Sequence, residues 1–324
     1  MTKAIRIHET GGPGVMKWEE VDPGRPGKGE VRLRHTAIGV NFIDAYVRAG
    51  LYPHPLPMTL GNEGAGVITA LGRGVTGLKI GDRVAYASNP LGSYAEERLY
   101  PADRCIKLPK EISDETAAAM MLKGMTARYL LREAYRVGTG DTILLHAAAG
   151  GLGLILCQWA KHLGATVIGT VGTKTKAALA RAHGCDHPIV YTEQDFVERV
   201  KRITRGAGVP VVYDSVGKDT FPGSLDCLRP RGMMVLFGAA SGPAPSIDPN
   251  VLNKKGCLYL TRPSLMVYNK TREELEACAA ALFDVVTGGK VKIEVNQTYP
   301  LSETAQAHRD LEGRKTTGST VLLP

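Results

Sequence analysis

The middle of the chain alternates short apolar runs with longer segments that end at a glycine. The short runs predict buried strands, and the longer segments predict helices. Strands are expected at residues 142–146, 166–170, 188–191, 209–214, 233–238 and 258–261. Helices are expected between them, for example at residues 174–183 and 194–204. This alternation is typical of a parallel sheet with helices on both faces, so residues 125–261 are interpreted as one α/β domain with its ligand at the carboxyl ends of the strands.

Residues 1–124 follow a different pattern, in which short strand-like segments are separated by turns rich in Gly and Pro. Alternating or β-branched residues predict strands near residues 4–8 and 31–36. Glycines then recur at short intervals between residues 61 and 81, which is typical of a compact barrel with sharp corners. A helix is expected at residues 113–135, with Ser113 as its cap.

The C-terminal segment, residues 262–324, does not continue the alternation. Its pattern predicts helices at residues 272–286 and 304–311, with a short strand at residues 291–295 between them. This segment is therefore not expected to extend the parallel sheet.

The turn at residues 146–153 follows the first parallel strand and is built almost entirely from small residues. Strand, tight turn and helix form the context in which glycines bind a dinucleotide, although Ala148 replaces the first glycine of the usual G-x-G-x-x-G pattern. Gly150 allows the backbone to approach a diphosphate, and Gly153 allows the helix and strand to pack closely. N–H groups at the helix start would hold the phosphates. The contacts expected in this turn are Gly150, Gly151, Leu152 and Gly153.

A membrane span is the alternative interpretation of this region, because residues 143–160 carry no charge. The glycine cluster, His146, Gln158 and the charged flanking sequence argue against it. No membrane partner is therefore expected.

The end of the second parallel strand distinguishes NAD from NADP. NAD enzymes place Asp or Glu there to bind the ribose hydroxyl, but no acidic residue lies between Asp141 and Asp186. The turn instead reads Gly172-Thr173-Lys174-Thr175-Lys176, which offers hydroxyl and ammonium donors to a phosphate. A solvated, lysine-rich helix start is the alternative, but lysines are unfavourable at a helix N-terminus. NADPH is therefore the expected cofactor.

The composition of the 324 residues is that of an ordinary globular chain, with 44% hydrophobic and 22% charged residues. The 40 basic and 32 acidic residues give a net charge of +8 but form no block of like charges, so a nucleic-acid partner is not expected. The six cysteines are scattered singly, which is typical of a reducing compartment. The start of the sequence has no signal-peptide core, and a cytoplasmic location is expected.

The sequence around the glycine turn resembles one family closely, the quinone oxidoreductase and zeta-crystallin group. This group belongs to the zinc-independent medium-chain dehydrogenase/reductases. The residues that carry the resemblance are Gly140, Asp141, Leu144, Ala148, Ala149, Gly150, Gly151, Gly153, Gln158 and Lys161.

The resemblance implies an α/β fold with two domains, a GroES-like β-barrel catalytic domain and a Rossmann doubly wound nucleotide-binding domain. Residues 1–124 and 262–324 would form the first, and residues 125–261 the second, with the active site in the cleft between them. It also implies a homodimer, for which the apolar segment at residues 257–260 is a suitable edge strand. Partners of the adenosine phosphate would be Lys176, Tyr191 and Arg314, beside Gly172 and Thr173. The other implied cofactor contacts are Asn41, Thr126, Ser215, Phe237, Gly238 and Arg262.

A catalytic zinc is not expected. Zinc alcohol dehydrogenases bind the metal through a Cys or His triad. Here the Gly-His-Glu motif reads Gly61-Asn62-Glu63, Asn41 replaces the expected cysteine, and no thiolate lies near Lys123.

The catalytic residues that the resemblance implies are Asn41, Tyr46 and Tyr52, in the segment that forms the substrate and nicotinamide wall. An amide could bind a quinone oxygen or the cofactor carboxamide, and the tyrosines offer flat faces. No general acid is evident, since His35, His54 and His308 are interpreted as surface residues, so water is the expected proton source.

Three functions remain open at this stage. The first is reduction of small quinones by NADPH, which needs no metal because the quinone itself stabilises the charge. The second is reduction of α,β-unsaturated aldehydes or ketones on the same scaffold. The third is a non-enzymatic role in RNA binding or as a crystallin, although the sequence has no RNA-binding motif.

Overall fold

The structure is a computed structural model that describes residues 1–324. The chain forms two compact units. The barrel unit contains Met1–Met125, Tyr268–Thr287 and Ile293–Pro324, and the parallel-sheet unit contains Thr126–Val267 and Gly288–Lys292. None of the helices has the length and apolar character needed to cross a bilayer.

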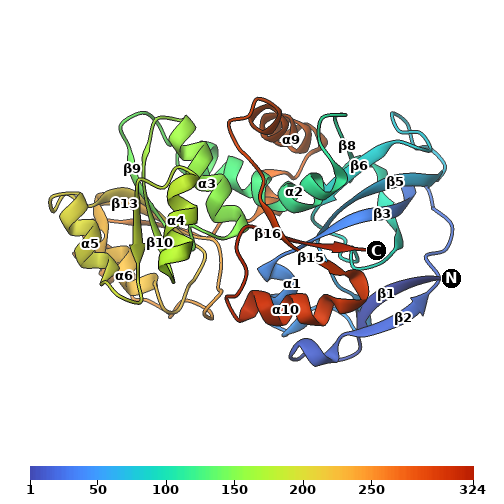
Figure 1. The fold of residues 1–324 in the computed structure, drawn as a ribbon, viewed down its shortest axis with the longest axis horizontal. Helices are drawn as coiled ribbons and strands as arrows, with labels where there is room; N and C mark the ends of the chain where they lie inside the picture. The colour runs from blue at the N-terminus through green and yellow to red at the C-terminus, as the bar shows by residue number, and fades with distance from the viewer. The chain divides into compact units, whose positions relative to one another are not determined.

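The parallel-sheet unit is built on six parallel strands in the order β11-β10-β9-β12-β13-β14. This is the doubly wound order, in which the direction of winding reverses between β9 and β12. The predicted parallel sheet is therefore confirmed. Figure 1 labels three of the strands, β9, β10 and β13. The strands are β9 (Thr142–Leu145), β10 (Thr166–Val171), β11 (His187–Val190), β12 (Val209–Asp214), β13 (Leu228–Leu236) and β14 (Tyr259–Thr261).

Helices cover this sheet, and apolar side chains of α5, α6 and α7 join the buried cluster that its strands form. α3 packs on β10, α4 packs on β10 and β11, and α6 packs on β12 and β13. Figure 1 shows α4 beside β10. Leu144, Ile168 and Val212 of the strands share one buried cluster with Phe221 and Leu225 of α6. The helices are α3 (Gly151–His162), α4 (Lys174–Ala182), α5 (Phe196–Ile203), α6 (Phe221–Asp226), α7 (Asn250–Lys254) and α8 (Leu265–Tyr268).

The barrel unit contains a three-stranded sheet, β2-β1-β4, and a larger sheet in which β15-β16-β3-β5-β6-β8 run in order and β7 also pairs with β3. The long strand β3 is central to the larger sheet, and the C-terminal strand β16 pairs with it, so that Val321 lies opposite Gly39. The strands are β1 (Thr2–Ile7), β2 (Lys17–Val21), β3 (Glu30–Val40), β4 (Met58–Thr59), β5 (Glu63–Leu71), β6 (Arg83–Ala87), β7 (Glu97–Pro101), β8 (Ile106–Lys107), β15 (Val295–Pro300) and β16 (Ser319–Leu323).

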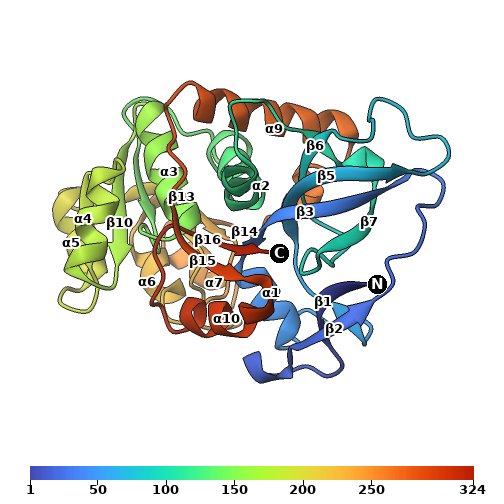
Figure 2. The ribbon, with the colours of Figure 1, turned by 45° about the vertical axis from the view of Figure 1, so that its right-hand side comes forward.

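Four helices accompany the barrel strands, and α10 lies beside α1 (Figure 2). The predicted cap of α2 is confirmed, since the Ser113 hydroxyl accepts the Thr116 N–H at 3.1 Å. The helices are α1 (Phe42–Arg48), α2 (Asp114–Tyr129), α9 (Arg272–Thr287) and α10 (Thr304–Glu312), with 3-10 turns at Pro13–Val15, Ala102–Arg104 and Leu301–Glu303. The end of α2 belongs to the parallel-sheet unit, where a π-helical turn at Leu130–Ala134 follows it.

The strand predicted at residues 291–295 is wrong, because the strand there, β15, begins only at Val295. The Gln158 side chain accepts the Lys292 N–H at 2.8 Å and donates to the Lys292 carbonyl at 3.0 Å. A side chain therefore satisfies the backbone that a neighbouring strand would otherwise pair with. The helix α1 was not foreseen at all.

Candidate functional site

The glycine turn of the parallel-sheet unit joins β9 to α3 as predicted. A Cβ on Gly153 would lie 2.2 Å from the Ala147 carbonyl oxygen, so only glycine permits this packing. Gly150 is the N-cap of α3 and supplies no side-chain hydrogen bond, and the first turn has no acidic residue. An uncapped helix N-terminus offers N–H groups and partial positive charge to a phosphate. The turn therefore suits a diphosphate.

The loop after β10 is held together by its own residues. The Thr173 hydroxyl accepts the Lys176 N–H at 3.2 Å and caps α4. A Cβ on Gly172 would lie 3.1 Å from the Tyr191 hydroxyl, so this tyrosine lies against the loop. Lys174 is exposed and pairs with Glu193 at 3.4 Å. The structure thus brings together Gly172, Thr173, Lys176 and Tyr191, at the end of the second strand of the parallel sheet.

Asp214 organises the carboxyl end of β12. It is fully buried, and its carboxylate accepts the N–H groups of Val216 and Gly217 at 2.8 and 3.0 Å. The hydroxyls of Thr220 and Ser224 donate to it at 2.7 and 2.8 Å. This carboxylate therefore fixes the turn that contains Ser215, one of the predicted cofactor contacts.

Phe237 and Gly238 lie beside this turn, at the end of β13. The Phe237 N–H donates to the Asp214 carbonyl at 2.9 Å, and a Cβ on Gly238 would lie 2.3 Å from the Ser215 carbonyl oxygen. Arg262 is anchored nearby in the sheet, where it donates to the Leu236 carbonyl at 3.0 Å. Among the other predicted contacts, Thr126 is buried in α2, whereas Arg314 is an exposed residue of the barrel unit.

His146 belongs to the same buried network and is not among the site residues expected from the sequence. Its ring nitrogens lie 2.8 Å from the Thr170 hydroxyl and 2.9 Å from the Ser224 hydroxyl. Burial lowers the pKa of this histidine, and the nearby Asp214 partly opposes that shift. A polar residue at the end of an otherwise apolar strand was the signal that could have identified it.

A second buried network lies in the barrel unit around Asp44, on α1. Its carboxylate accepts the Asn41 N–H at 2.9 Å, the Asn62 amide at 2.6 Å and the Tyr94 hydroxyl at 2.9 Å. Burial raises the pKa of Asp44 to about 6, although these hydrogen bonds oppose the shift. Asp44 therefore connects the two asparagines singled out by the sequence.

The network continues from Tyr94 to His308, whose ring lies 3.0 Å from the tyrosine oxygen and 2.9 Å from Arg48. The prediction that His308 is a surface residue is wrong, because α10 packs it into the interior, where it is fully buried. His35 is also buried, between the Ala95 carbonyl and the Tyr86 hydroxyl, so the same prediction is wrong for it. His54 is exposed, as predicted.

Tyr46 and Tyr52 form an edge-to-face pair with ring centroids 5.8 Å apart, and Phe42 lies 6.1 Å from Tyr46. Both tyrosines are half-buried. The predicted tyrosines therefore do lie together, on and just after the helix that Asn41 begins. Such a cluster offers an aromatic surface to a flat molecule.

Glu63 and Lys123 form a buried ion pair in the barrel unit. The Lys123 ammonium lies 3.2 Å from a Glu63 carboxylate oxygen and 3.3 Å from the Val40 carbonyl. The other Glu63 oxygen accepts the Leu122 N–H at 2.6 Å. Burial raises the pKa of Glu63, and Lys123 is the main opposing influence. The sequence indicates only that no thiolate lies near Lys123 and gives no sign of this ion pair.

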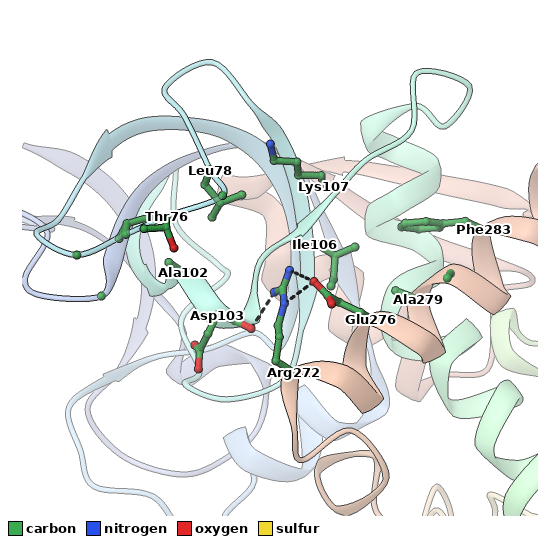
Figure 3. Close-up of a pocket in the computed structure, with 15 residues that line it drawn as sticks. Thr76, Leu78, Ala102, Asp103, Ile106, Lys107, Arg272, Glu276, Ala279 and Phe283 are labelled. Carbon is green, nitrogen blue, oxygen red and sulfur yellow. Dashed lines mark hydrogen bonds and ion pairs between the residues drawn. The ribbon is translucent and has the colours of Figure 1, made fainter.

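The barrel unit also contains a cavity of about 850 Å³ that includes no predicted site residue (Figure 3). Leu78, Ile106 and Phe283 are among its apolar walls. Arg272 of α9 lies between Asp103 and Glu276, as Figure 3 shows. It donates to the Asp103 carbonyl at 2.8 Å and to the Glu276 carboxylate at 2.7 Å, so its guanidinium is hydrogen-bonded within the protein.

Comparison with known proteins places this geometry in a family. Residues 27–110 match the alcohol dehydrogenase GroES-like domain, and residues 151–282 match the zinc-binding dehydrogenase domain. The chain is 52% identical to a quinone oxidoreductase of Pseudomonas aeruginosa over the whole of both chains. It is also 52% identical to a 2-haloacrylate reductase of a Burkholderia species, covering 100% of this chain and 99% of that one.

A solved structure agrees with these sequence matches. Escherichia coli quinone oxidoreductase complexed with NADPH superposes with a TM-score of 0.98 at 50% identity, covering 99% of this chain and 100% of that one. The resemblance noted at the glycine turn thus extends over the full length. The chain therefore belongs to the quinone oxidoreductase family of the medium-chain dehydrogenase/reductases.

Proposed function

We propose that this protein is an NADPH-dependent quinone oxidoreductase. The observation that carries the proposal is its full-length similarity to the Escherichia coli enzyme crystallised with NADPH. Two features of the chain fit that cofactor. The uncapped N-terminus of α3 suits a diphosphate, and the loop that follows β10 contains no Asp or Glu of its own to bind a ribose hydroxyl in place of a 2′-phosphate.

Within the parallel-sheet unit, Gly150, Gly151, Leu152 and Gly153 would hold the diphosphate. The adenosine phosphate would be bound by Gly172, Thr173, Lys176 and Tyr191, and also by Arg314. The nicotinamide half would contact Ser215, Phe237, Gly238, Thr126, Arg262 and Asn41. NADPH supplies the hydride when it is bound, and the protein orients the two reactants and excludes water.

The test is direct. Purified protein should oxidise NADPH in the presence of small ortho- or para-quinones, measured by the loss of the reduced-nicotinamide absorbance. Absence of turnover with every quinone of a panel would contradict the proposal.

A second activity is supported by the 2-haloacrylate reductase relative. A haloacrylate is an alkene activated by a conjugated carboxylate, so it accepts hydride at carbon as an enone does. We therefore propose reduction of activated alkenes as the alternative reaction. The same assay with haloacrylates, enals and enones distinguishes the two.

Lys176 should carry much of the preference for NADPH. A charge-assisted hydrogen bond contributes roughly 1.5–3 kcal/mol, so Lys176→Ala should weaken NADPH binding about tenfold or more. NADH has no 2′-phosphate, and its affinity should barely change. Isothermal titration with both cofactors measures this, and Lys174→Ala, which removes the exposed neighbour paired with Glu193, is the matched control. Equal weakening toward both cofactors would mean that Lys176 is structural.

We also propose a homodimer formed through the edge of the parallel sheet. β14 has only β13 as a neighbour, so its outer edge has no partner strand. Apolar side chains gather on and after it: Tyr259, Leu260, Met266 and Val267 are 59%, 39%, 43% and 69% exposed. A second copy of the chain could continue the sheet across this edge.

Val267→Glu should therefore convert the protein to a monomer, because a buried carboxylate without a partner is costly at an interface. Light scattering at micromolar concentration would measure the mass, and circular dichroism the fold. Ile80→Glu is the matched control, since Ile80 is a 63% exposed apolar residue of the barrel unit. A wild-type protein that is already monomeric would contradict the proposal.

A cytoplasmic location is also proposed. All six cysteines are free thiols and five of them are buried, which suits a reducing compartment. Fractionation of the source cells tests this location.

A further inference from the structure

The three positions at which a zinc dehydrogenase would bind its metal converge in the barrel unit. Asn41 and Asn62 both donate to Asp44, and Lys123 donates to the carbonyl of Val40, which directly precedes Asn41. Zinc needs Cys, His or carboxylate ligands, whereas these positions hold two amides and an ammonium. The residues therefore do not fit the metal that the description of the matching family domain names.

Lys123 supplies a positive charge at this place. The residue is only 8% exposed, and its ammonium has two acceptors, the Glu63 carboxylate and the Val40 carbonyl. An ammonium carries three N–H donors, so one remains for a ligand. The side chain keeps 10% of its surface exposed, so it is not sealed into the core.

Asn41 supplies a second donor beside it. Its side-chain nitrogen is buried and has no acceptor in good hydrogen-bond geometry, and the interaction with Glu63 that lowers the pKa of that carboxyl engages at most one of its two N–H donors. An unpaired buried N–H costs about 1–3 kcal/mol and calls for an explanation. A ligand oxygen that accepts from both Asn41 and Lys123 would satisfy this N–H and explain why it has no partner within the protein.

We propose that the Lys123 ammonium and the Asn41 amide together bind the carbonyl or carboxylate oxygen of the acceptor and stabilise the negative charge that it gains. The proposal rests on the proposed function. Hydride, with its electron pair, adds to the acceptor carbon, and the conjugated π pair moves to this oxygen. The acceptor is reduced by two electrons, the nicotinamide is oxidised by two, and the proton comes from water. The substrate class is thus an acceptor whose reacting carbon is conjugated to such an oxygen.

If Lys123 and Asn41 stabilise negative charge on the acceptor oxygen, the loss of kcat on removing them should depend on the acceptor. A quinone already delocalises the incoming charge, whereas an acrylate does so poorly. Removing a preorganised donor from an oxyanion site lowers kcat by about 10²-fold in known cases. The loss should therefore reach this size for 2-haloacrylates and enones and be smaller for benzoquinone.

The main test uses the double variant Lys123→Met with Glu63→Gln, because Lys123→Met alone would leave the buried carboxylate unpaired. Lys107→Met is the matched control, since Lys107 is exposed and paired with Asp82 in the same unit. The double variant should lose about 10²-fold in kcat with 2-haloacrylates and enones and less with benzoquinone. Its affinity for NADPH should be unchanged. Asn41→Ala removes the other donor without touching the ion pair and should lower kcat about tenfold, so the proposal stays testable if the double variant does not fold.

A second readout does not depend on turnover. The probe is 4-nitrophenol, a phenol that changes absorbance on ionisation, bound to the protein together with NADP⁺. A nearby cation lowers the pKa of an acid by about 1–3 units, so wild-type protein and Lys107→Met should ionise the bound probe at lower pH than free probe. Lys123→Met with Glu63→Gln should abolish this shift.

Different results would contradict the reductase activity and the role of Lys123 and Asn41. If wild-type protein reduces no acceptor, the proposed function is wrong, and the 4-nitrophenol titration still decides whether the donor pair binds an oxyanion. If wild-type protein is active but the double variant and Asn41→Ala keep both kcat and the ionisation shift, the role assigned to Lys123 and Asn41 is overturned.

Discussion

Acidification from pH 7 to about pH 4.5 is expected to destabilise the folded protein by a few kcal/mol, because His35 and His308 are buried as neutral rings. Burial lowers the pKa of each to about 3, with further lowering by Arg98 beside His35 and Arg48 beside His308. The ordinary histidine value is 6.5. Between these values the unfolded chain binds more protons than the folded one, so stability is lost as the pH falls.

Asp44 opposes this loss only in part. Its folded pKa, about 6, lies above its ordinary value of 3.8, so between those values the folded state binds the additional proton and gains stability on acidification. One pKa unit corresponds to about 1.4 kcal/mol, which gives a loss of about 3 kcal/mol for each histidine at pH ~4.5 and a gain of about 2 kcal/mol for Asp44. For these three groups the net effect is therefore a loss of a few kcal/mol, and the lowered pKa of His146 and the raised pKa of Glu63 act in opposite directions on acidification.

His308→Gln tests this account without removing the hydrogen bonds. Glutamine can accept from Arg48 through its oxygen and donate toward Tyr94 through its nitrogen, but it does not titrate. Urea unfolding at several pH values should show that this variant loses about 3 kcal/mol less than wild type between pH 7 and about 4.5. His54→Gln, at an exposed position, should change nothing. An equally steep acid dependence in His308→Gln would contradict the assignment.

The sequence predicted the parallel sheet well because its strands are short apolar runs bounded by glycines. The range expected for β12, residues 209–214, coincides with Val209–Asp214. The barrel unit was harder to predict. α1 has only seven residues, and its N-cap lies in a segment that the resemblance assigned to the substrate wall. β15 was misplaced because the Gln158 side chain, 134 residues away, satisfies the backbone of Lys292.

The candidate site shows a similar division. Gly153 and Gly172 could be identified from local motifs because their roles depend on backbone geometry. The buried ion pair of Lys123 with Glu63 joins residues 60 positions apart, and the contact of Arg48 with His308 spans 260 positions. A single sequence carries no signal for such pairs, so a lysine in a helix is interpreted as exposed.

Asp214→Ala is expected to destabilise the protein by roughly 2–6 kcal/mol and to abolish cofactor binding. The buried N–H of Gly217 and the partly buried N–H of Val216 would lose their acceptor, and each unsatisfied group costs up to about 1–3 kcal/mol. The hydroxyls of Thr220 and Ser224 would lose theirs as well. The turn that carries Ser215 would keep backbone hydrogen bonds such as that from the Phe237 N–H to the Asp214 carbonyl, but it would lose the carboxylate that holds Val216 and Gly217 in place.

Asp214→Asn tests whether the hydrogen bonds or the negative charge of Asp214 matters. Its amide oxygen can still accept from Val216 and Gly217, which both donate to the same carboxylate oxygen. The new NH₂ would face Ser224, which today donates to Asp214 and so accepts from His146. Ser224 could turn to donate to His146, and the imidazole proton would move to the nitrogen that faces Thr170. The hydrogen bonds along Asp214, Ser224, His146 and Thr170 would survive with their direction reversed, and those from Val216 and Gly217 would keep theirs.

The two variants should therefore separate clearly in urea unfolding and in titration with NADPH. Asp214→Asn is expected to remain within about 1.5 kcal/mol of wild type, the contribution of one ordinary hydrogen bond, and to keep its affinity. If Asp214→Asn were as damaging as Asp214→Ala, the negative charge would be the essential feature of the turn. If both variants were mild, the hydrogen bonds of Asp214 would contribute little to stability. The positions of Ser215, Phe237 and Gly238 would then be fixed by the close packing of Gly238 against the backbone, where a Cβ would lie 2.3 Å from the Ser215 carbonyl oxygen.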